Sequence, residues 1–210
     1  MKRDLYKCGV KAPTTKQKQM IIKDKTFKED EVISRDFEGA TFVKCKFTNL
    51  NFHFTNFTNC IFKVCDFSGS TFDITNFTKC FFPESKLSSL DFGSCDIKDC
   101  NFSGAVINNS IFQKMTGAKN EKKLFNLTGS NFENTDLMGT VFSFCNLEKV
   151  VFKDSVLVGC VFEKCNLKET DFSSANIESV NFENSKIDKT ILDIEGFIKF
   201  GNSKGFVLSK

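Results

Sequence analysis

Ten cysteines and a single histidine are the side chains of this 210-residue chain best suited to metal binding or nucleophilic catalysis. Nine of the cysteines are separated by multiples of five residues, and none belongs to a CxxC pair. Zinc sites need closely spaced ligand pairs, and a cysteine or serine nucleophile needs a base such as histidine. His53 is expected on an outer face, as an ordinary surface residue. The pattern predicts no catalytic residue, no metal site and no cofactor, and it favours cysteine as a small apolar side chain that remains a free thiol.

The cysteines share a five-residue rhythm with the phenylalanines. Of 27 Phe, 20 fall in one phase of this period between residues 27 and 182, and nine cysteines lie two residues before a position of that phase. A helix would spread these rings around its whole surface. A flat strand would point successive rings to opposite faces, because five is an odd number. The repeat is therefore expected to consist of short extended pieces, each with one small and one large inward residue, separated by corners.

Four such pieces joined by right-angled corners close a square coil of twenty residues. Cys60, Cys80 and Cys100 are twenty residues apart, as expected for side chains at one place in successive coils. From residue 127 to 187 Phe alternates with Leu or Ile, which would put Phe on two opposite walls and limit crowding in a close-packed interior. The predicted fold is all-β: a right-handed quadrilateral parallel β-helix with a filled interior that offers no pocket.

Charge and breaks in the period divide the chain into segments. Residues 1–25 carry eight Lys or Arg and two Asp. Between the two repeat regions, Gly117 and Lys122 would fall on core positions that they cannot fill. The predicted segments are a basic arm (1–25), a first stack of about four coils (26–112), a loop or a joint between stacks (113–124), a second stack (125–192) and a C-terminal cap (193–210).

The last segment abandons the period. Its apolar residues from Leu192 to Phe200 follow helical spacing, and Gly201 or Gly205 would stop such a helix. Phe206–Leu208 is then expected to form a short strand. A solenoid end needs a cap, but this segment is too apolar to be wholly exposed, which favours a homodimer surface. The residues predicted to form that surface are Ile194, Phe197, Ile198, Phe200, Phe206 and Leu208.

The sequence gives no sign of a membrane partner. No apolar run approaches the length of about 18 residues that a membrane span needs. The charged N-terminus is followed by no apolar segment of the kind found in a secretory signal. The expected compartment is the cytoplasm, where thiols stay reduced.

Individual repeats match a known motif. Cys65-Asp66-Phe67-Ser68-Gly69 and Cys165-Asn166-Leu167-Lys168-Glu169 follow the order small, Asp or Asn, Leu or Phe, polar, polar. Over residues 37–192 the chain resembles the pentapeptide-repeat family, which implies the solenoid fold. The segments Lys25–Asp30 and Ser34–Phe37 resemble the start of the quinolone-resistance (Qnr-like) members of that family.

The second resemblance implies a partner and its contact residues. Qnr-like proteins protect DNA gyrase and topoisomerase IV, carry a loop midway along the solenoid and dimerise through an apolar C-terminal helix, and their acidic rod has been likened to duplex DNA. By this resemblance, the loop residues expected to contact the partner are Lys114, Met115, Lys119, Glu121, Lys122 and Lys123. The acidic wall expected to face the enzyme's basic DNA-binding surface consists of Glu133, Asp136, Glu148, Asp154, Glu163, Glu169, Asp171 and Glu178.

Two other interpretations stay open. Residues 26–210 carry 21 basic and 24 acidic side chains, a net charge of −3, whereas electrostatic mimicry needs charge density. An earlier loop of many Qnr-like proteins is also missing. A scaffold with another protein partner, unrelated to topoisomerases, fits the same repeat. Direct nucleic-acid binding is disfavoured, because the arm lysines have no interleaved aromatic residues and the acidic body repels phosphate.

Overall fold

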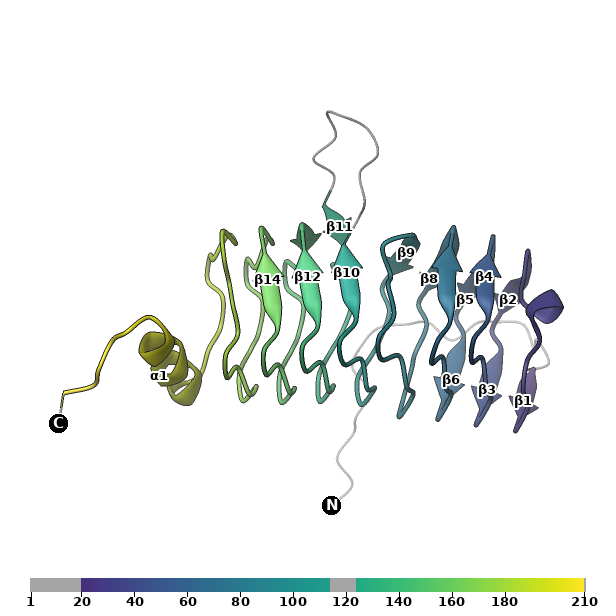
Figure 1. The fold of residues 1–210 in the computed structure, drawn as a ribbon, viewed down its shortest axis with the longest axis horizontal. Helices are drawn as coiled ribbons and strands as arrows, with labels where there is room; N and C mark the ends of the chain where they lie inside the picture. The colour runs from purple at the N-terminus through teal and green to yellow at the C-terminus, as the bar shows by residue number, and fades with distance from the viewer. Residues whose placement is uncertain (1–19, 114–123, 210) are drawn as a thin grey trace, which may run out of the picture.

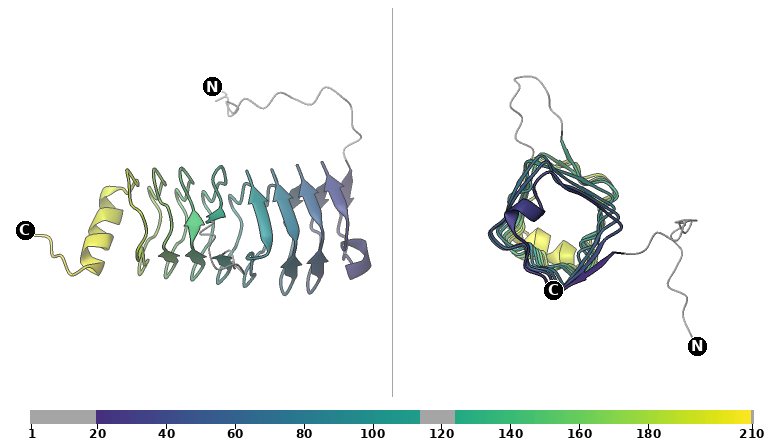
Figure 2. Two further views of the ribbon diagram at one scale, coloured as in Figure 1. Left: turned by 90° about the horizontal axis from the view of Figure 1, so that it is seen from above. Right: turned by 90° about the vertical axis from the view of Figure 1, so that its right-hand side faces the viewer.

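The computed structural model describes residues 20–113 and 124–209. Figure 1 shows coils stacked along one axis, with the helix α1 (Ile194–Ser203) at the C-terminal end. Viewed along the axis, the coils superpose as a four-sided prism (Figure 2). Residues twenty apart pair in parallel register, as in Ile22 with Phe42 and Phe42 with Phe62. The predicted right-handed quadrilateral parallel β-helix is confirmed.

Each coil contributes one short extended piece to each of four faces, numbered here in the order in which the chain enters them from Ile21. In the described residues, face 2 is held by isolated parallel bridges such as Lys46 with Asp66. Face 1 contains β1 (Ile21–Lys23), β3 (Thr41–Val43) and β6 (Ile61–Lys63). Face 3 contains β4 (Asn51–His53), β7 (Thr71–Asp73), β10 (Ile111–Gln113), β12 (Val141–Ser143) and β14 (Val161–Glu163). Face 4 contains β2 (Asp36–Glu38), β5 (Asn56–Thr58), β8 (Thr75–Thr78), β9 (Cys95–Lys98), β11 (Phe125–Asn126) and β13 (Cys145–Asn146).

The corners lie two residues after each large inward residue, and most of them have positive φ. Asn49, Asn59 and Asn109 have φ between 54° and 58°, a region that asparagine tolerates better than most residues. Gly69 (φ 72°) meets two requirements at once, because a Cβ there would also collide with Asn49. Polar corner residues therefore let the chain turn toward the next face every five residues.

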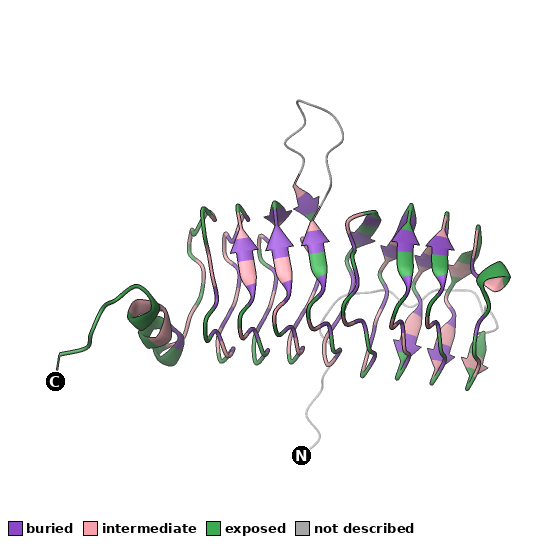
Figure 3. Ribbon diagram, viewed as in Figure 1, coloured by how far each residue is buried: buried purple, intermediate pink, exposed green. Residues whose placement is uncertain are grey.

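The Phe rings form columns along the prism axis. Phe62 stacks on Phe42 and on Phe82 with centroid distances of 5.0 Å and interplanar angles of 8°. Rings on adjacent faces meet edge to face, as Phe42 and Phe47 do at 5.3 Å and 78°. Both are favoured geometries for aromatic pairs. Most of these Phe residues are buried, and buried positions recur along the strands in Figure 3. From residue 127 to 182 the inward Phe residues occupy faces 1 and 3, opposite walls as predicted.

The small inward residues explain the cysteine pattern. Thr55 Oγ1 donates to the carbonyl oxygen of Val32 at 2.8 Å, Ser110 Oγ to that of Leu87 at 2.8 Å, and Cys145 Sγ to that of Phe112 at 3.0 Å. The small inward position thus accepts a short side chain that also donates a hydrogen bond to a backbone carbonyl in the preceding coil. Cysteine meets both requirements with a weak donor.

Ten extra residues enter the repeat without breaking the prism. The register step is thirty residues, instead of twenty, between Ile111 and Val141 and between Asn101 and Asn131. Gln113 pairs with Ser143, and Phe125 pairs with Cys145. The regions predicted as two stacks are therefore one continuous stack, and the alternative of a joint that bends the rod is wrong.

The stack begins earlier than the sequence predicts. Ile21–Lys23 (β1) pairs with β3, so the segment expected to be a basic arm (1–25) contributes its last residues to the first coil. A single 3₁₀ turn, η1 (Glu29–Glu31), follows. Lys25 lies over the Phe27 ring at 4.5 Å and forms an ion pair with Glu31 at 2.7 Å. These contacts cover part of the first ring layer at this end of the prism.

At the other end, α1 lies across the last coil. Asp193 caps its N-terminus by accepting a hydrogen bond from Gly196 N at 2.7 Å. Gly205 (φ 85°) ends it, with the Phe206 amide donating to the Gly201 carbonyl at 3.0 Å, a Schellman motif. The helix predicted in the C-terminal segment is confirmed. The strand predicted at Phe206–Leu208 is wrong, because this segment is extended beyond the prism without a strand to pair with.

Replacing a stacked ring by alanine tests the role of the columns. Phe112 is fully buried between Phe92 (4.6 Å) and Phe142 (4.9 Å). Phe112→Ala is expected to lower the free energy of unfolding by about 3–5 kcal/mol, because it leaves a cavity in a close-packed core. Met138→Ala, at an exposed side chain on face 2, is the control and should change it by about 0.5 kcal/mol at most. Urea denaturation at fixed protein concentration measures both, and equal losses would contradict the filled-core description.

Candidate interaction surfaces

The nine described cysteines are buried and unbridged. Burial raises the pKa of the Cys65 and Cys160 thiols to about 12. Burial is also the main cause that raises the pKa of Cys80, whereas a hydrogen bond with the Cys80 thiol lowers the pKa of Cys60. No group of three metal-ligating side chains gathers anywhere in the described residues. These thiols fill the interior, and none is placed for chemistry at a surface.

His53 lies on face 3, where its side chain is partly exposed. Its Nδ1 is 2.7 Å from Asp73 Oδ2 in the next coil. The ring also meets the Phe54 ring edge to face at 4.2 Å. The prediction of an ordinary surface position is confirmed.

The predicted acidic wall does not exist as one wall. Glu163 lies on face 3 and Glu148 on face 4, and the eight carboxylates are spread over all four faces because a face recurs only every twenty residues. Those on face 1 or its corner are Glu133, Asp154 and Asp171, those on face 2 are Asp136 and Glu178, and the other at face 4 is Glu169.

Several of these carboxylates are also paired with lysines. Lys168 Nζ lies 2.9 Å from Glu148 Oε1, and this contact lowers the pKa of Glu148 and raises the pKa of Lys168. Lys164 lies 3.1 Å from Glu163, and Lys149 lies 3.8 Å from Glu169. Neighbouring cations thus offset part of the negative charge that the prediction relied on. The predicted loop residues Lys114, Met115, Lys119, Glu121, Lys122 and Lys123 lie outside the described residues.

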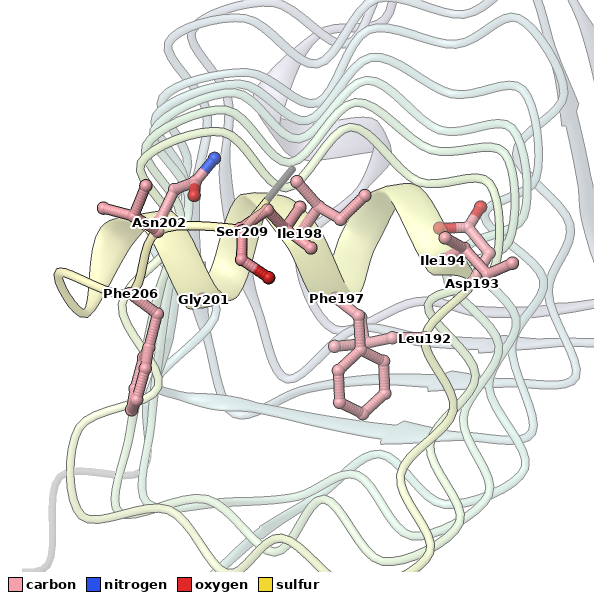
Figure 4. A pocket seen from close by; sticks show the side chains of 11 residues that line it. Leu192, Asp193, Ile194, Phe197, Ile198, Gly201, Asn202, Phe206 and Ser209 are labelled. Carbon is pink, nitrogen blue, oxygen red and sulfur yellow. The ribbon is translucent and has the colours of Figure 1, made fainter.

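The C-terminal segment carries a large exposed apolar surface. Exposed side chains of α1 and of Phe206–Leu208 surround an open hollow of about 640 Å³, seen in Figure 4. The predicted absence of a pocket concerned the interior of the prism. This hollow lies outside the prism, and the sequence did not predict it. Exposure ranges from 37% for Ile198 to 91% for Val207. Ile194, Phe197, Phe206 and Leu208, predicted for a dimer surface, are all exposed here.

Phe200 departs from that predicted set. Its ring packs edge to face on Phe182 at 5.8 Å and closes the core at the last coil. Phe200 therefore presents less of its ring to a dimer surface than Phe197 does, since helical periodicity turns it and the buried Gly196 toward the prism.

A second exposed apolar set was missed from the sequence. Phe54, Ile74 and Phe144 are exposed at corner positions. Their separations, 20 and 70 residues, equal whole coils once the ten inserted residues are counted. That spacing is present in the sequence, but it lies in the corner phase, which the inward Phe and Cys pattern does not include.

The fold and these surfaces define a class: a filled parallel β-solenoid built from five-residue units. The chain belongs to the pentapeptide-repeat family. A pentapeptide repeat region matches residues 125–192, and pentapeptide repeats match residues 34–63 and 65–114. No curated protein matches the sequence significantly.

Two structures of QnrB1 show the same fold at low sequence identity. Full-length QnrB1, a plasmid-mediated fluoroquinolone resistance protein, is 19% identical with a TM-score of 0.60, covering 89% of this chain and 98% of its own. A trypsin-treated QnrB1 variant is 17% identical with a TM-score of 0.56, covering 91% and 99%. HetL from the cyanobacterium Nostoc, involved in heterocyst differentiation regulation, is 11% identical with a TM-score of 0.38, covering 80% and 85%. No helix of the described residues is long and apolar enough to cross a membrane.

Thiol reactivity tests the interior role of the cysteines. A Cys8→Ser variant retains only the nine cysteines seen in the prism. In its native state at pH about 8 these thiols are expected to react with a disulfide reagent at least about a hundredfold more slowly than free cysteine, because the packed interior blocks access of the reagent to them. All nine should react in denaturant. Rapid labelling of one or more thiols in the native chain would contradict this assignment.

Proposed function

We propose that this chain is a non-enzymatic rod that binds other proteins through its outer surfaces, and that its partner is DNA gyrase or topoisomerase IV. The filled core carries the first part of the proposal. Rings and small side chains occupy the interior along the described stack, so ligands are left with flat walls, corners and ends. Repeat solenoids commonly use such extended surfaces to bind macromolecules.

The topoisomerase partner is supported by the likeness to QnrB1 together with features of this chain. The described stack matches nearly the whole length of QnrB1. It takes up ten extra residues midway along the rod, and it ends in an apolar helix. Binding of this kind would protect the enzyme from quinolones. The cytoplasm is the compartment in which such a partner would be met.

One observation favours the alternative, a scaffold for a protein unrelated to topoisomerases. The carboxylates expected to imitate DNA are spread over four faces, and several are paired with lysines. We therefore propose that contact with a topoisomerase depends mainly on complementary shape and apolar side chains, and less on charge.

We further propose that two copies join end to end through the C-terminal surface. Ile194, Phe197 and Phe206 border the hollow beside α1, and contiguous exposed apolar patches of this kind mark interaction sites. A two-fold pairing would bury the same patch on both copies. The partner would then meet a rod of twice the length, with the first coil of each copy at an outer end.

A supercoiling assay tests the topoisomerase partner. The purified full chain is expected to restore DNA supercoiling by gyrase that ciprofloxacin has inhibited, and to bind gyrase directly. Deleting residues 114–123 returns the coil spacing to twenty residues, so this variant should fold. If the inserted residues contact the enzyme, the variant should lose rescue.

Absence of both rescue and binding by the wild-type chain, with topoisomerase IV as well as gyrase, would leave the scaffold alternative. Rescue undiminished by the deletion would make the insertion a passive surface segment.

Sedimentation tests the end-to-end pairing. The wild-type chain is expected to be a dimer at concentrations above about 1 µM. Phe197→Ser with Phe206→Ser should weaken dimerisation by about tenfold or more, because both rings would leave the apolar contact. Phe144→Ser removes an exposed ring far from α1 and is the matched control. A wild-type monomer at every accessible concentration would contradict the pairing.

A further inference from the structure

Among the described residues, four corner positions hold a bulky apolar residue with a left-handed backbone conformation. They are Phe54, Val64, Ile74 and Phe144, with φ of 50°, 56°, 49° and 53°. This conformation is unfavourable for residues with a Cβ, and most of all for β-branched ones. The side chains are also exposed, Phe54 and Ile74 by 50% each and Val64 by 38%. Burial therefore does little to offset the unfavourable backbone. Left-handed φ values occur at most corners of the prism, so the departure at these four is the apolar side chain, which is exposed where polar residues or glycine stand at the other corners.

Three of the four lie on one edge, between faces 3 and 4. The Phe54 amide donates to the Asp73 carbonyl at 3.1 Å, directly before Ile74 in the next coil. The Phe144 amide makes the equivalent bond to Glu163 at 2.9 Å. With a coil spacing of about 4.8 Å, the edge from Phe54 to Phe144 is roughly 19 Å long. We name Phe54, Ile74 and Phe144 the apolar edge. Val64 lies on the diagonally opposite edge.

The ten-residue insertion joins the prism at the same edge. Gln113 ends β10 on face 3, and Phe125 begins β11 on face 4. The two attachment points lie between the coils of Ile74 and Phe144. Two departures from the repeat, one in chain length and one in corner chemistry, therefore coincide on one of four edges.

The rim of the apolar edge is polar and more acidic than basic. Among the described residues, Asp73 and Glu163 flank it on face 3 and Asp96 flanks it on face 4, with Lys164 at the edge itself. Asp73 lies 2.7 Å from His53 Nδ1, and Glu163 lies 3.1 Å from Lys164. Lys164 lies over the Phe144 ring at 4.9 Å.

The remaining face 4 rim is built from an asparagine ladder. Asn76 Nδ2 donates to Asn56 Oδ1 at 2.6 Å, and Asn166 Nδ2 to Asn146 Oδ1 at 2.8 Å. Together with Asp73, Asp96 and Glu163, these neutral amides form a rim that suits a basic partner surface.

We propose that the apolar edge is the surface by which the rod contacts its protein partner, and that the partner presents a groove with an apolar floor and Lys or Arg at its rims. A corner of the prism is convex (Figure 2), so it fits a concave partner surface about 19 Å long. Phe54 and Phe144 are the anchors, since buried aromatic side chains carry much of the binding energy at interfaces. This proposal rests on the topoisomerase-binding function proposed above and assigns the surface that performs it.

Ile74→Asn and Val64→Asn form a matched pair for the test. Each replaces a β-branched corner residue by one that tolerates the left-handed region. Both should raise the melting temperature by about 2–4 °C. Only Ile74→Asn should weaken binding of fluorescently labelled full chain to gyrase holoenzyme or to topoisomerase IV. The triple variant Phe54→Asn, Ile74→Asn, Phe144→Asn should weaken it by about tenfold or more.

The outcomes separate this surface from the function on which it rests. Wild-type binding with an equally tight triple variant would overturn the apolar edge and leave the topoisomerase partner standing. An effect of Val64→Asn as large as that of Ile74→Asn would also overturn it, because the contact would not be specific to one edge. Failure of the wild-type chain to bind either enzyme would remove the proposed partner and this surface together.

Discussion

Stacking of rings in register is the constraint on which this structure depends. Adjacent parallel strands lie about 4.8 Å apart, and the Phe42 and Phe62 rings lie 5.0 Å apart. Aromatic columns and backbone ladders therefore favour the same twenty-residue coil. The columns also fill the square section, so the interior has no further use. Binding must then take place at faces, edges and ends, and features that break the repeat on the outside are the natural candidates for function.

Much of the fold was predictable because an odd period excludes both helix and flat sheet. Core positions, coil length and the Phe walls follow from that rhythm alone. Features that depend on neighbours in space did not follow. Phe125 fills a slot that mostly holds small residues, packing near Phe112 where the insertion rejoins the stack. Phe206–Leu208 has strand-forming residues, but a strand needs a partner edge, and α1 carries this segment away from the stack.

The interaction surfaces were harder to predict than the core. The acidic set was chosen from neighbouring repeats along the chain. A face is formed by residues twenty apart, so these carboxylates lie on different faces of the prism. The apolar edge obeys the coil rule, but its significance depends on backbone conformation at Ile74, which sequence patterns do not reveal. The C-terminal surface was predicted in outline. Only the structure distinguishes Phe200, which caps the core, from Phe197, which is exposed.

The central claim is that a rod with a full interior acts through one of its edges. Hydrogen–deuterium exchange of the full chain, alone and bound to gyrase holoenzyme, tests this claim most directly. We expect slower exchange on binding at residues 53–55, 73–75 and 143–145, with faces 1 and 2 unchanged. Protection confined to faces 1 and 2, or an exchange pattern that gyrase does not alter, would contradict the account.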